Sequence, residues 1–127
     1  MKVLSLATRE RMQFVNITRN VQEAVRALQL RDGTITVFVP HTTAGIIINE
    51  QADPAVMADL GAHLAQRVPA HANYRHAEGN SAAHIQAGLL GSSVQVLVRD
   101  GQLQLGTWQG VFFCEFDGPR AREFWGG

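Results

Sequence analysis

The sequence predicts a single α+β domain over residues 1–127, with a largely antiparallel sheet and about three helices on one side of it. Two observations carry this prediction. Helix-like and strand-like segments are mixed along the chain without a regular alternation of strand, helix and strand. The C-terminal half is rich in hairpin signals, of which Asp100-Gly101 between two strand-like runs is the strongest. No repeat, low-complexity linker or domain boundary divides the chain, and its length suits one domain.

The first part of the chain predicts two short strands followed by a helix. Val3–Leu6 and Phe14–Ile17 are strand-like runs joined by a polar turn. Thr18 is a candidate N-cap, and the apolar residues after it are spaced as on one face of a helix that runs to about Leu30. These apolar residues are Val21, Ala24, Val25 and Leu28.

The middle of the chain predicts two more strands and a longer helix. Thr34–Val39 is rich in β-branched residues and ends at Pro40, and Ala44–Asn49 continues as another strand. Asp53 is a candidate N-cap, and Pro54 suits the first helical position. The apolar residues that follow are spaced by four, which predicts a helix with one apolar stripe. They are Val56, Leu60, Leu64 and Val68.

The last part of the chain predicts a third helix and four short strands. A polar loop over residues 71–80 comes first. Asn80 or Ser81 caps the helix Ala82–Leu90, which ends at Gly91. The strands predicted after this helix are Ser93–Val98, Leu103–Leu105, Gln109–Phe116 and Ala121–Trp125.

The composition excludes several classes of protein. Hydrophobic residues at 46% and charged residues at 17% are ordinary for a globular chain and argue against disorder. Eleven basic residues balance eleven acidic ones, so the chain has no net charge to attract nucleic acid or an anionic membrane. No apolar run approaches the ~18 residues of a membrane span. The N-terminal apolar run is too short for a signal peptide, so a cytoplasmic location is expected.

The single cysteine, Cys114, rules out an intrachain disulfide. It lies in a strand-like apolar run, which predicts a place in the core and argues against a role as nucleophile.

Residues 40–50 place polar side chains at both ends of an apolar strand. His41 and Glu50 bracket three consecutive isoleucines, and both ends carry groups able to bind a ligand or a metal. The alternative, favoured on this segment alone, is that both are ordinary strand-end residues facing water. A strand of about nine residues spans roughly 30 Å. His41 and Glu50 therefore share one pocket only if the chain bends, for example at Gly45, or if a second copy brings them together.

Histidines form a second cluster around the loop over residues 71–80. His76 lies on the loop and His84 in the first turns of the next helix, an arrangement able to bring imidazoles together around a metal. The spacing matches no named ligand motif. His63, in the middle of a helix, is interpreted as structural, and His71 as solvent-facing.

Residues 106–122 form a third polar cluster. Glycines on both sides of Thr107-Trp108-Gln109 permit a close approach of the backbone. Arg120 and Arg122 alternate on a predicted strand, so their guanidinium groups share a face suited to a phosphate or carboxylate. The alternative, slightly favoured from spacing alone, is a set of surface salt bridges. Acidic partners available for them are Glu115, Asp117 and Glu123.

Taken together, the three clusters resemble the YjbQ-like family, and the match covers nearly the whole chain in the family's order. Each motif is weak alone, but jointly they are distinctive. The matching strings are His41-Thr-Thr-Ala-Gly-Ile, Asn49-Glu50-x-x-Asp53, Asn73-Tyr74-x-His76, Asn80-x-x-x-His84-Ile85, Gly91-Ser92-Ser93, Gly106-Thr107-Trp108-Gln109 and Glu115-x-Asp117-Gly118-Pro119-Arg120-x-Arg122.

The resemblance implies a compact α+β fold built on a mostly antiparallel β-sandwich, assembled as a homotrimer. Members of the family carry the name secondary thiamine-phosphate synthase. That activity joins hydroxymethylpyrimidine diphosphate to a thiazole phosphate and releases pyrophosphate. The implied partners are a small phosphorylated metabolite and further copies of the chain, with no nucleic acid and no membrane.

The resemblance also implies a metal site. The family's three recurrent histidines match His41, His76 and His84, which we expect to converge on a divalent metal. Zinc is the expected ion, with magnesium as an option beside pyrophosphate. Three protein ligands would leave one position open for water or substrate.

The remaining site residues follow from the same resemblance. Glu50 is expected to act as a general base or to orient a histidine, and the two arginines of the third cluster are expected to hold a phosphate. The expected catalytic residues are Glu50, Asp53 and Gln109. The residues expected to bind the substrate are Thr43, Asn49, Asn80, Ser92, Thr107, Arg120 and Arg122.

Three functions stay open at this point. The first is a transferase acting on phosphorylated small molecules. The second is a hydrolase in which the three-histidine metal site activates water on a phosphate or another ester. The third is not enzymatic: a trimer whose interface pockets bind a small anionic metabolite. The chain lacks the Asp-rich clusters usual for magnesium pyrophosphate, which counts against the first.

Overall fold

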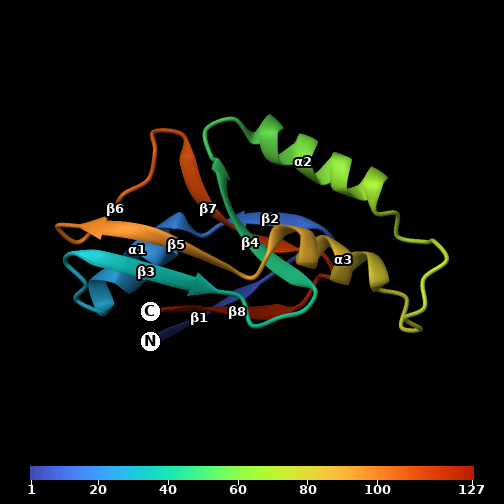
Figure 1. The fold of residues 1–127 in the computed structure, drawn as a ribbon, viewed down its shortest axis with the longest axis horizontal. Coiled ribbons are helices and arrows are strands. Elements are labelled where there is room, and N and C mark those ends of the chain that lie inside the picture. Colours follow the sequence, from blue (N-terminus) through green and yellow to red (C-terminus); the bar gives the residue numbers. More distant parts are fainter.

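Eight strands and three helices follow one another along residues 1–127 in the computed structural model (Figure 1). The strands are β1 (Lys2–Ala7), β2 (Gln13–Asn16), β3 (Gly33–Phe38), β4 (Ala44–Glu50), β5 (Ser93–Arg99), β6 (Gln102–Leu103), β7 (Gln109–Glu115) and β8 (Ala121–Gly126). The helices are α1 (Thr18–Ala27), α2 (Pro54–Arg67) and α3 (Ser81–Leu90).

The strands form two sheets in which every pairing is antiparallel. The larger sheet has the order β1-β8-β3-β5-β6, and the smaller one has the order β2-β7-β4. The two chain ends lie close together beside β1 and β8 (Figure 1). The predicted α+β class, with an antiparallel sandwich and three helices, is confirmed.

Strand β7 supplies side chains to two separate cores, because its residues alternate between the faces of the smaller sheet. Val111 and Phe113 belong to the larger cluster, together with residues of α1 and the five-stranded sheet. Phe112 and Cys114 belong to a second cluster with residues of α2 and α3. The prediction that Cys114 is a core residue is confirmed, and its burial raises the pKa of the thiol.

Strand β4 is apolar through its middle because both of its faces are covered. Ile46 is fully buried in the larger core, Ile47 packs against the second cluster, and Ile48 packs against the larger core. A strand covered on both sides reads as a continuous hydrophobic run. The run of three isoleucines is therefore explained by two cores, one on each side of the strand.

The C-terminal end of α3 is attached directly to β4. The backbone N–H of Ile46 donates to the carbonyl oxygen of Gly91, at 3.1 Å. A Cβ atom placed on Gly45 would lie 2.8 Å from that same oxygen. Glycine at position 45 thus permits the close approach of α3 to β4. Strand β4 continues through Gly45, so the chain does not bend there.

The helix starts agree with the sequence in one case and differ in another. Asp53 caps α2 as predicted, with its Oδ1 accepting a hydrogen bond from the N–H of Ala55 at 2.9 Å. Thr18, predicted as the N-cap of α1, is instead the first helical residue. Asn16 takes over part of the capping, because its Oδ1 accepts from the N–H of Thr18 at 3.0 Å.

One predicted strand, Leu103–Leu105, is misplaced, and the predicted alternation of Arg120 with Arg122 along the last strand is wrong. Only Gln102–Leu103 of the segment around residue 103 forms a strand. Arg120 lies just before β8, so it does not alternate with Arg122 along that strand. None of the three helices combines the length and the hydropathy needed to cross a bilayer.

Candidate functional site

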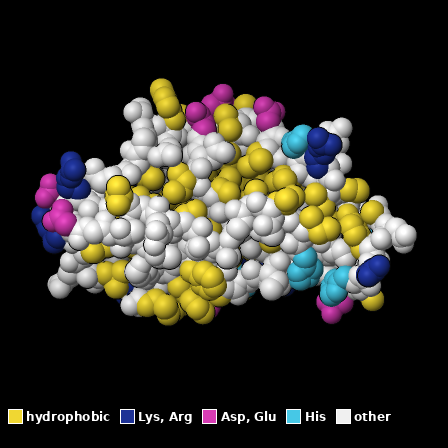
Figure 2. All heavy atoms as spheres, viewed as in Figure 1, with side chains coloured by type: hydrophobic (Ala, Val, Ile, Leu, Met, Phe, Trp, Pro, Cys, Tyr) yellow, Lys and Arg dark blue, Asp and Glu magenta, His cyan; other side chains and the backbone are white.

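A cavity of about 360 Å³ lies at the amino-terminal end of α3, where the loop over residues 71–80 meets the helix. His76 on the loop and His84 on the helix face each other edge to face, with ring centroids 5.1 Å apart. Figure 2 shows histidine side chains (cyan) gathered over this end of the molecule, with basic and acidic side chains beside them. The cavity is lined by Tyr74, Arg75, His76, Ser81, His84 and Ile85.

The amino-terminal end of α3 is not capped by any side chain. Ser81 in the first turn is only 7% exposed, and its Oγ has no hydrogen-bond partner. The Oδ1 atom of Asn80, the residue before it, is also buried and unpaired. Buried polar groups without partners are rare in folded proteins. Free N–H groups, a positive helix end and an unpaired hydroxyl together make this end of α3 suited to an anion.

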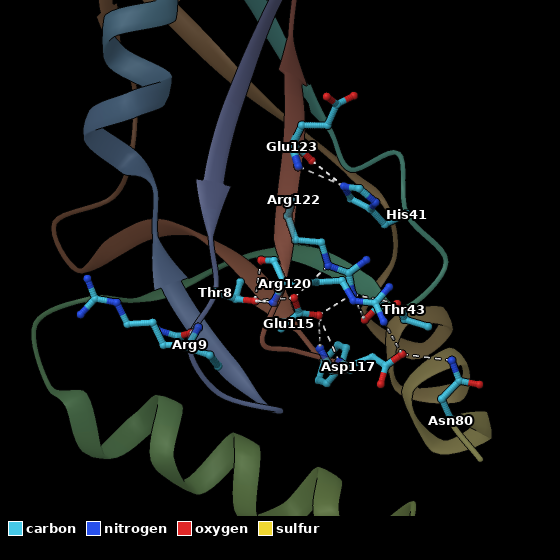
Figure 3. A network of polar contacts seen from close by, with 12 residues as sticks. Thr8, Arg9, His41, Thr43, Asn80, Glu115, Asp117, Arg120, Arg122 and Glu123 are labelled. Carbon is cyan, nitrogen blue, oxygen red and sulfur yellow. Dashed lines mark hydrogen bonds and ion pairs between the residues drawn. The ribbon is translucent and has the colours of Figure 1, made fainter. Parts of the chain in front are cut away.

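Asp117 connects α3 to the turn between β7 and β8. Its Oδ2 accepts a hydrogen bond from the Nδ2 of Asn80 at 3.0 Å and one from the Nη2 of Arg120 at 3.2 Å. Figure 3 shows the three side chains joined in this way at the end of the helix. Arg120 is half exposed, so its remaining N–H groups are available to a ligand.

Beneath this turn lies a buried ion pair between Glu115 and Arg122 (Figure 3). The Nε of Arg122 donates to Oε1 of Glu115 at 2.8 Å, and its Nη2 donates to Oε2 of the same carboxylate and to Oγ1 of Thr43. The hydroxyl of Thr8 donates to Oε1 of Glu115 at 2.7 Å. The pair therefore links β7 and β8 with the residue after β1 and the loop before β4.

The pKa of Glu115 reflects this environment. Burial by itself opposes ionisation of the carboxyl group, but hydrogen bonds from Arg122, Thr8 and the backbone of Asp117 outweigh it. The pKa of Glu115 is therefore lowered, and the carboxylate stays charged. The guanidinium of Arg122 is committed to Glu115 and Thr43 in the interior, so the surface salt bridges considered as the alternative do not describe Arg122. Arg120 is the arginine in a surface salt bridge, with Asp117 at 3.2 Å, and its side chain stays half exposed.

His41 lies apart from the two histidines of the cavity, on the loop between β3 and β4. Its Nε2 is 3.1 Å from the backbone nitrogen of Glu123, whose N–H donates to it, and 3.1 Å from that residue's carbonyl oxygen (Figure 3). Burial and the nearby charge of Arg122 lower the pKa of His41, which favours the neutral imidazole that accepts this bond.

No group of three or more His, Cys, Asp or Glu side chains suited to a metal gathers within one chain. His76 and His84 meet, and each can offer an imidazole nitrogen, but His41 does not join them. The imidazoles of His76 and His84 thus fit a metal, and a third ligand would have to come from outside this pair. The three-histidine site remains a prediction.

The expected catalytic residues lie at the other end of β4. Strand β4 pairs with β7 from Ala44 opposite Glu115 to Glu50 opposite Gln109, so the two ends are separated by the whole strand. Oε2 of Glu50 accepts from the N–H of Asp53 at 3.0 Å, and Oε1 of Gln109 accepts from the N–H of Gly106 at 2.8 Å. Both interactions hold turns in place.

The other expected substrate residues are spread over the surface and the buried pair. Asn49 accepts a hydrogen bond from the N–H of Glu50, and Thr107 and Ser92 are exposed in two different loops. Thr43 is buried against Arg122. Of the expected substrate residues, only Asn80 adjoins the cavity at α3, as the residue before Ser81, and Arg120 is linked to Asn80 through Asp117.

A sequence profile of the family described as "UPF0047 protein YjbQ-like" matches residues 2–126. The chain belongs to the YjbQ-like family. A UPF0047 protein of Methanocaldococcus jannaschii is 48% identical over 120 residues, covering 94% of this chain and 87% of the relative. YugU of Bacillus subtilis is 45% identical over 123 residues, covering 96% and 93%.

Solved structures of YjbQ-like proteins share the whole fold. An uncharacterised member from Clostridium acetobutylicum is 49% identical, with a TM-score of 0.98 over 100% of this chain and 98% of that one. A conserved hypothetical protein of Thermus thermophilus is 44% identical, with a TM-score of 0.93 over 100% and 98%. The resemblance found in the sequence is confirmed. Family membership establishes the fold and leaves the reaction to be argued from the site.

Sequence reasoning missed three members of this site. Ser81 is predicted only as a possible helix cap, although the residue lines the cavity and its buried hydroxyl has no partner. Arg75 was grouped with a polar loop, and Thr8 with a polar turn. Thr8 and Glu115 are 107 positions apart, so no local pattern could have indicated their hydrogen bond.

Proposed function

We propose that this YjbQ-like protein is an enzyme acting on a phosphorylated small molecule whose phosphate binds at the amino-terminal end of α3. One observation carries the proposal. The ring centroids of His76 and His84 lie 5.1 Å apart in the cavity at α3. The same cavity is lined by Ser81, whose buried hydroxyl has no partner, at a helix start that no side chain caps.

The phosphate is supported by the charges and donors around the cavity. The free N–H groups of the first turn of α3 and its helix dipole favour an anion. Arg75 lines the cavity, and the half-exposed Arg120 is linked through Asp117 to Asn80, the residue before the first turn of α3. Arginine suits phosphate because its N–H groups form bidentate, charge-assisted hydrogen bonds.

The two imidazoles supply the chemistry. Histidine is the side chain whose ordinary pKa lies nearest neutral pH, so one imidazole can hold a proton for a leaving group while the other accepts one. His76 and His84 are close enough to face the same bound phosphate ester. They would act as acid and base at the bond that breaks.

The specific reaction favoured by the resemblance is the thiamine-phosphate synthase type. Hydroxymethylpyrimidine diphosphate and a thiazole phosphate are joined, and pyrophosphate leaves. In this proposal the diphosphate leaving group is the one held at α3. Hydrolysis of a phosphate ester is the second candidate, supported by the two adjacent imidazoles that could hold a zinc ion and its water.

A divalent metal, if present, would be held by His76 and His84 together with a third donor, for which His41 of another copy is the candidate. The bound ion would supply Lewis acidity toward a phosphate oxygen. Metal analysis of the purified protein beside His84→Ala tests this. Equal metal content in the two proteins would remove the site from consideration.

The reaction is tested by turnover with matched variants. We expect wild-type protein to release pyrophosphate from the two synthase substrates, or phosphate from a monoester. His84→Ala should lower kcat by about 10²–10⁴-fold, the usual contribution of a general acid or base. Ser81→Ala should mainly raise KM, since it removes a phosphate donor. His63→Ala, on the exposed side of α2, is the control and should leave kcat unchanged.

Two other results would contradict this proposal. Saturable binding of phosphorylated ligands without turnover of any of them would replace the enzyme with a metabolite-binding protein. Full activity in both His76→Ala and His84→Ala would show that the cavity at α3 takes no part in the reaction.

A further inference from the structure

We infer a second ligand site, in the cavity between the end of α2 and the first half of α3, that binds a small carboxylic acid with an apolar body and a hydrogen-bond donor at its far end. This cavity is separate from the one at the amino-terminal end of α3, because the two share no lining residue. Its two polar lining residues are Arg11 and Gln86. The inference does not depend on the proposed reaction.

The walls of the cavity are apolar, and its volume is about 260 Å³. Pockets for drug-sized ligands usually measure roughly 300–1,000 Å³, so this one suits a smaller molecule. A short hydrocarbon body would bury apolar surface against the walls. The apolar lining residues come from the segment before β2, the end of α2 and the loop after it, the start of α3 and the residue after β7: Met12, Ala65, Val68, Ala70, Ala82 and Phe116.

Gln86 supplies a polar group whose orientation is fixed. The residue is only 4% exposed, and its Nε2 donates to the carbonyl oxygens of Leu64 at 3.3 Å and Val68 at 3.4 Å. The reverse orientation of the amide would turn its oxygen toward these two carbonyl oxygens, which cannot donate. The nitrogen of Gln86 therefore holds the end of α2, and Oε1 is left without a partner in the chain.

The unpaired oxygen of Gln86 opens on the cavity. Two other side-chain atoms without a partner, Oδ1 of Asn80 and Oγ of Ser81, are sealed inside the protein. Oε1 of Gln86 is not sealed in this way, so it is reached from the cavity that the residue lines. An acceptor without a partner in an apolar space favours a ligand that donates a hydrogen bond to it.

Arg11 is the only charged residue that lines the cavity. Its side chain takes part in no ion pair, and its backbone is held in place because its carbonyl oxygen accepts from the N–H of Gly118 at 3.1 Å. Arg11 is exposed and Gln86 is buried, so the charge lies at the mouth and the acceptor lies inside. An unpaired guanidinium binds a carboxylate through charge-assisted hydrogen bonds.

These features select one kind of occupant. A carboxylate at the mouth meets Arg11, a hydrocarbon body lies along the walls, and a hydroxyl group at the far end donates to Oε1 of Gln86. A cation would be repelled by Arg11, and a molecule without a donor would leave the oxygen of Gln86 unpaired. A phosphate dianion would need further donors, and the mouth offers a single arginine.

The test is an NMR titration of the full chain with three probes of matched length. They are 6-hydroxyhexanoate, hexanoate, which lacks the donor, and 1,6-hexanediol, which lacks the charge. We expect saturable shifts from the hydroxy acid, centred on the backbone amides of Met12, Val68 and Gln86. Each of the other two probes should bind about tenfold more weakly. Equal binding of all three probes, or no saturable binding of the hydroxy acid, would overturn the inference.

Matched variants locate the site. Arg11→Gln should weaken the hydroxy acid about tenfold and leave the diol unchanged, whereas Arg9→Gln, outside the cavity, should bind both as wild type. Ala65→Leu, at an exposed position of α2, fills the cavity and should abolish the shifts. Ala62→Leu is exposed on the same helix outside the cavity and should not. Wild-type binding by Ala65→Leu, or equal weakening of acid and diol by Arg11→Gln, would contradict the site.

Discussion

At the scale of single residues, the buried ion pair of Glu115 and Arg122 is the feature that one substitution disrupts most directly. Glu115 is completely buried, and its two oxygens receive hydrogen bonds from Arg122, Thr8 and backbone N–H groups. Removing one partner of a buried pair leaves the other charge uncompensated. The same pair underlies the turn that carries Asp117 and Arg120, so it also positions the residues beside the cavity.

Glu115→Gln should lower the free energy of unfolding by about 3–5 kcal/mol, the usual cost of breaking a buried ion pair from one side. Urea unfolding at pH 7 measures this. The control is Glu78→Gln, whose side chain is 77% exposed and which should change stability by less than about 0.5 kcal/mol. Equal stability of the two variants would contradict the role given to the pair.

The pH dependence of stability follows from the same carboxylate. The folded state lowers the pKa of Glu115 below its ordinary value of 4.5, so the unfolded chain binds this proton more readily. The contribution of Glu115 is complete above pH 4.5 and is lost as the pH falls through the lower, folded pKa. Wild-type stability should therefore fall more steeply between pH 5 and pH 3 than that of Glu115→Gln, approximately the range expected for a lowered carboxyl pKa.

At the scale of elements, the position of α3 decides the geometry of the cavity. Its C-terminal end is bound to β4 through the carbonyl oxygen of Gly91, and its first turn is tied to Asp117 through Asn80. Both anchors come from the strand pair β4 and β7 or from the turn after it. A shift of α3 along β4 would therefore move His84 relative to His76.

Gly45→Ala tests this anchoring. The added Cβ would lie 2.8 Å from the carbonyl oxygen of Gly91, so α3 must move away from β4. We expect a loss of about 1–3 kcal/mol in the free energy of unfolding, as for other overpacked sites, and a higher KM for the phosphorylated substrate.

The control for that substitution is Gly88→Ala, in the same helix but with open space around it. It should stabilise the protein by about 0.5–1 kcal/mol, because alanine is the better helix former. If Gly45→Ala is as stable as Gly88→Ala and keeps its KM, the contact between α3 and β4 does not set the cavity.

At the scale of the whole molecule, the polar residues at the two ends of β4 are too far apart to share a site unless copies of the chain assemble. A continuous seven-residue strand separates Thr43 and its neighbours from Glu50, and its length is roughly 20–25 Å. Within one chain, Glu50 and Gln109 therefore do not reach His84. We propose that a homotrimer completes the site, with Glu50, Asp53 and Gln109 of one copy beside the cavity of the next. Trp108, 62% exposed next to Gln109, is available for such an interface.

Mixing two inactive variants tests the shared site. His84→Ala and Glu50→Gln should each be nearly inactive, but after joint refolding about one quarter of the sites would combine two intact halves from different copies. We expect activity to recover to that level. The control is a mixture of His84→Ala with His76→Ala, whose changes lie in the same half and cannot complement. No recovery in the first mixture would confine the site to a single chain.

The sequence by itself determined the fold class, the three helices and most strands, because these depend on local spacing of apolar residues and on turn and cap signals. It also determined the family, because the polar motifs keep their order along the chain. It placed His76 and His84 near each other for a local reason, since only a short loop and one helical turn separate them.

The tertiary structure decided the rest. The partners of Arg122 are Glu115 and Thr43, and the latter is 79 positions away, so only chain packing reveals that this arginine is buried and committed. The unpaired hydroxyl of Ser81 is likewise a property of what surrounds it, because a serine that caps a helix and one that awaits a ligand look the same in sequence.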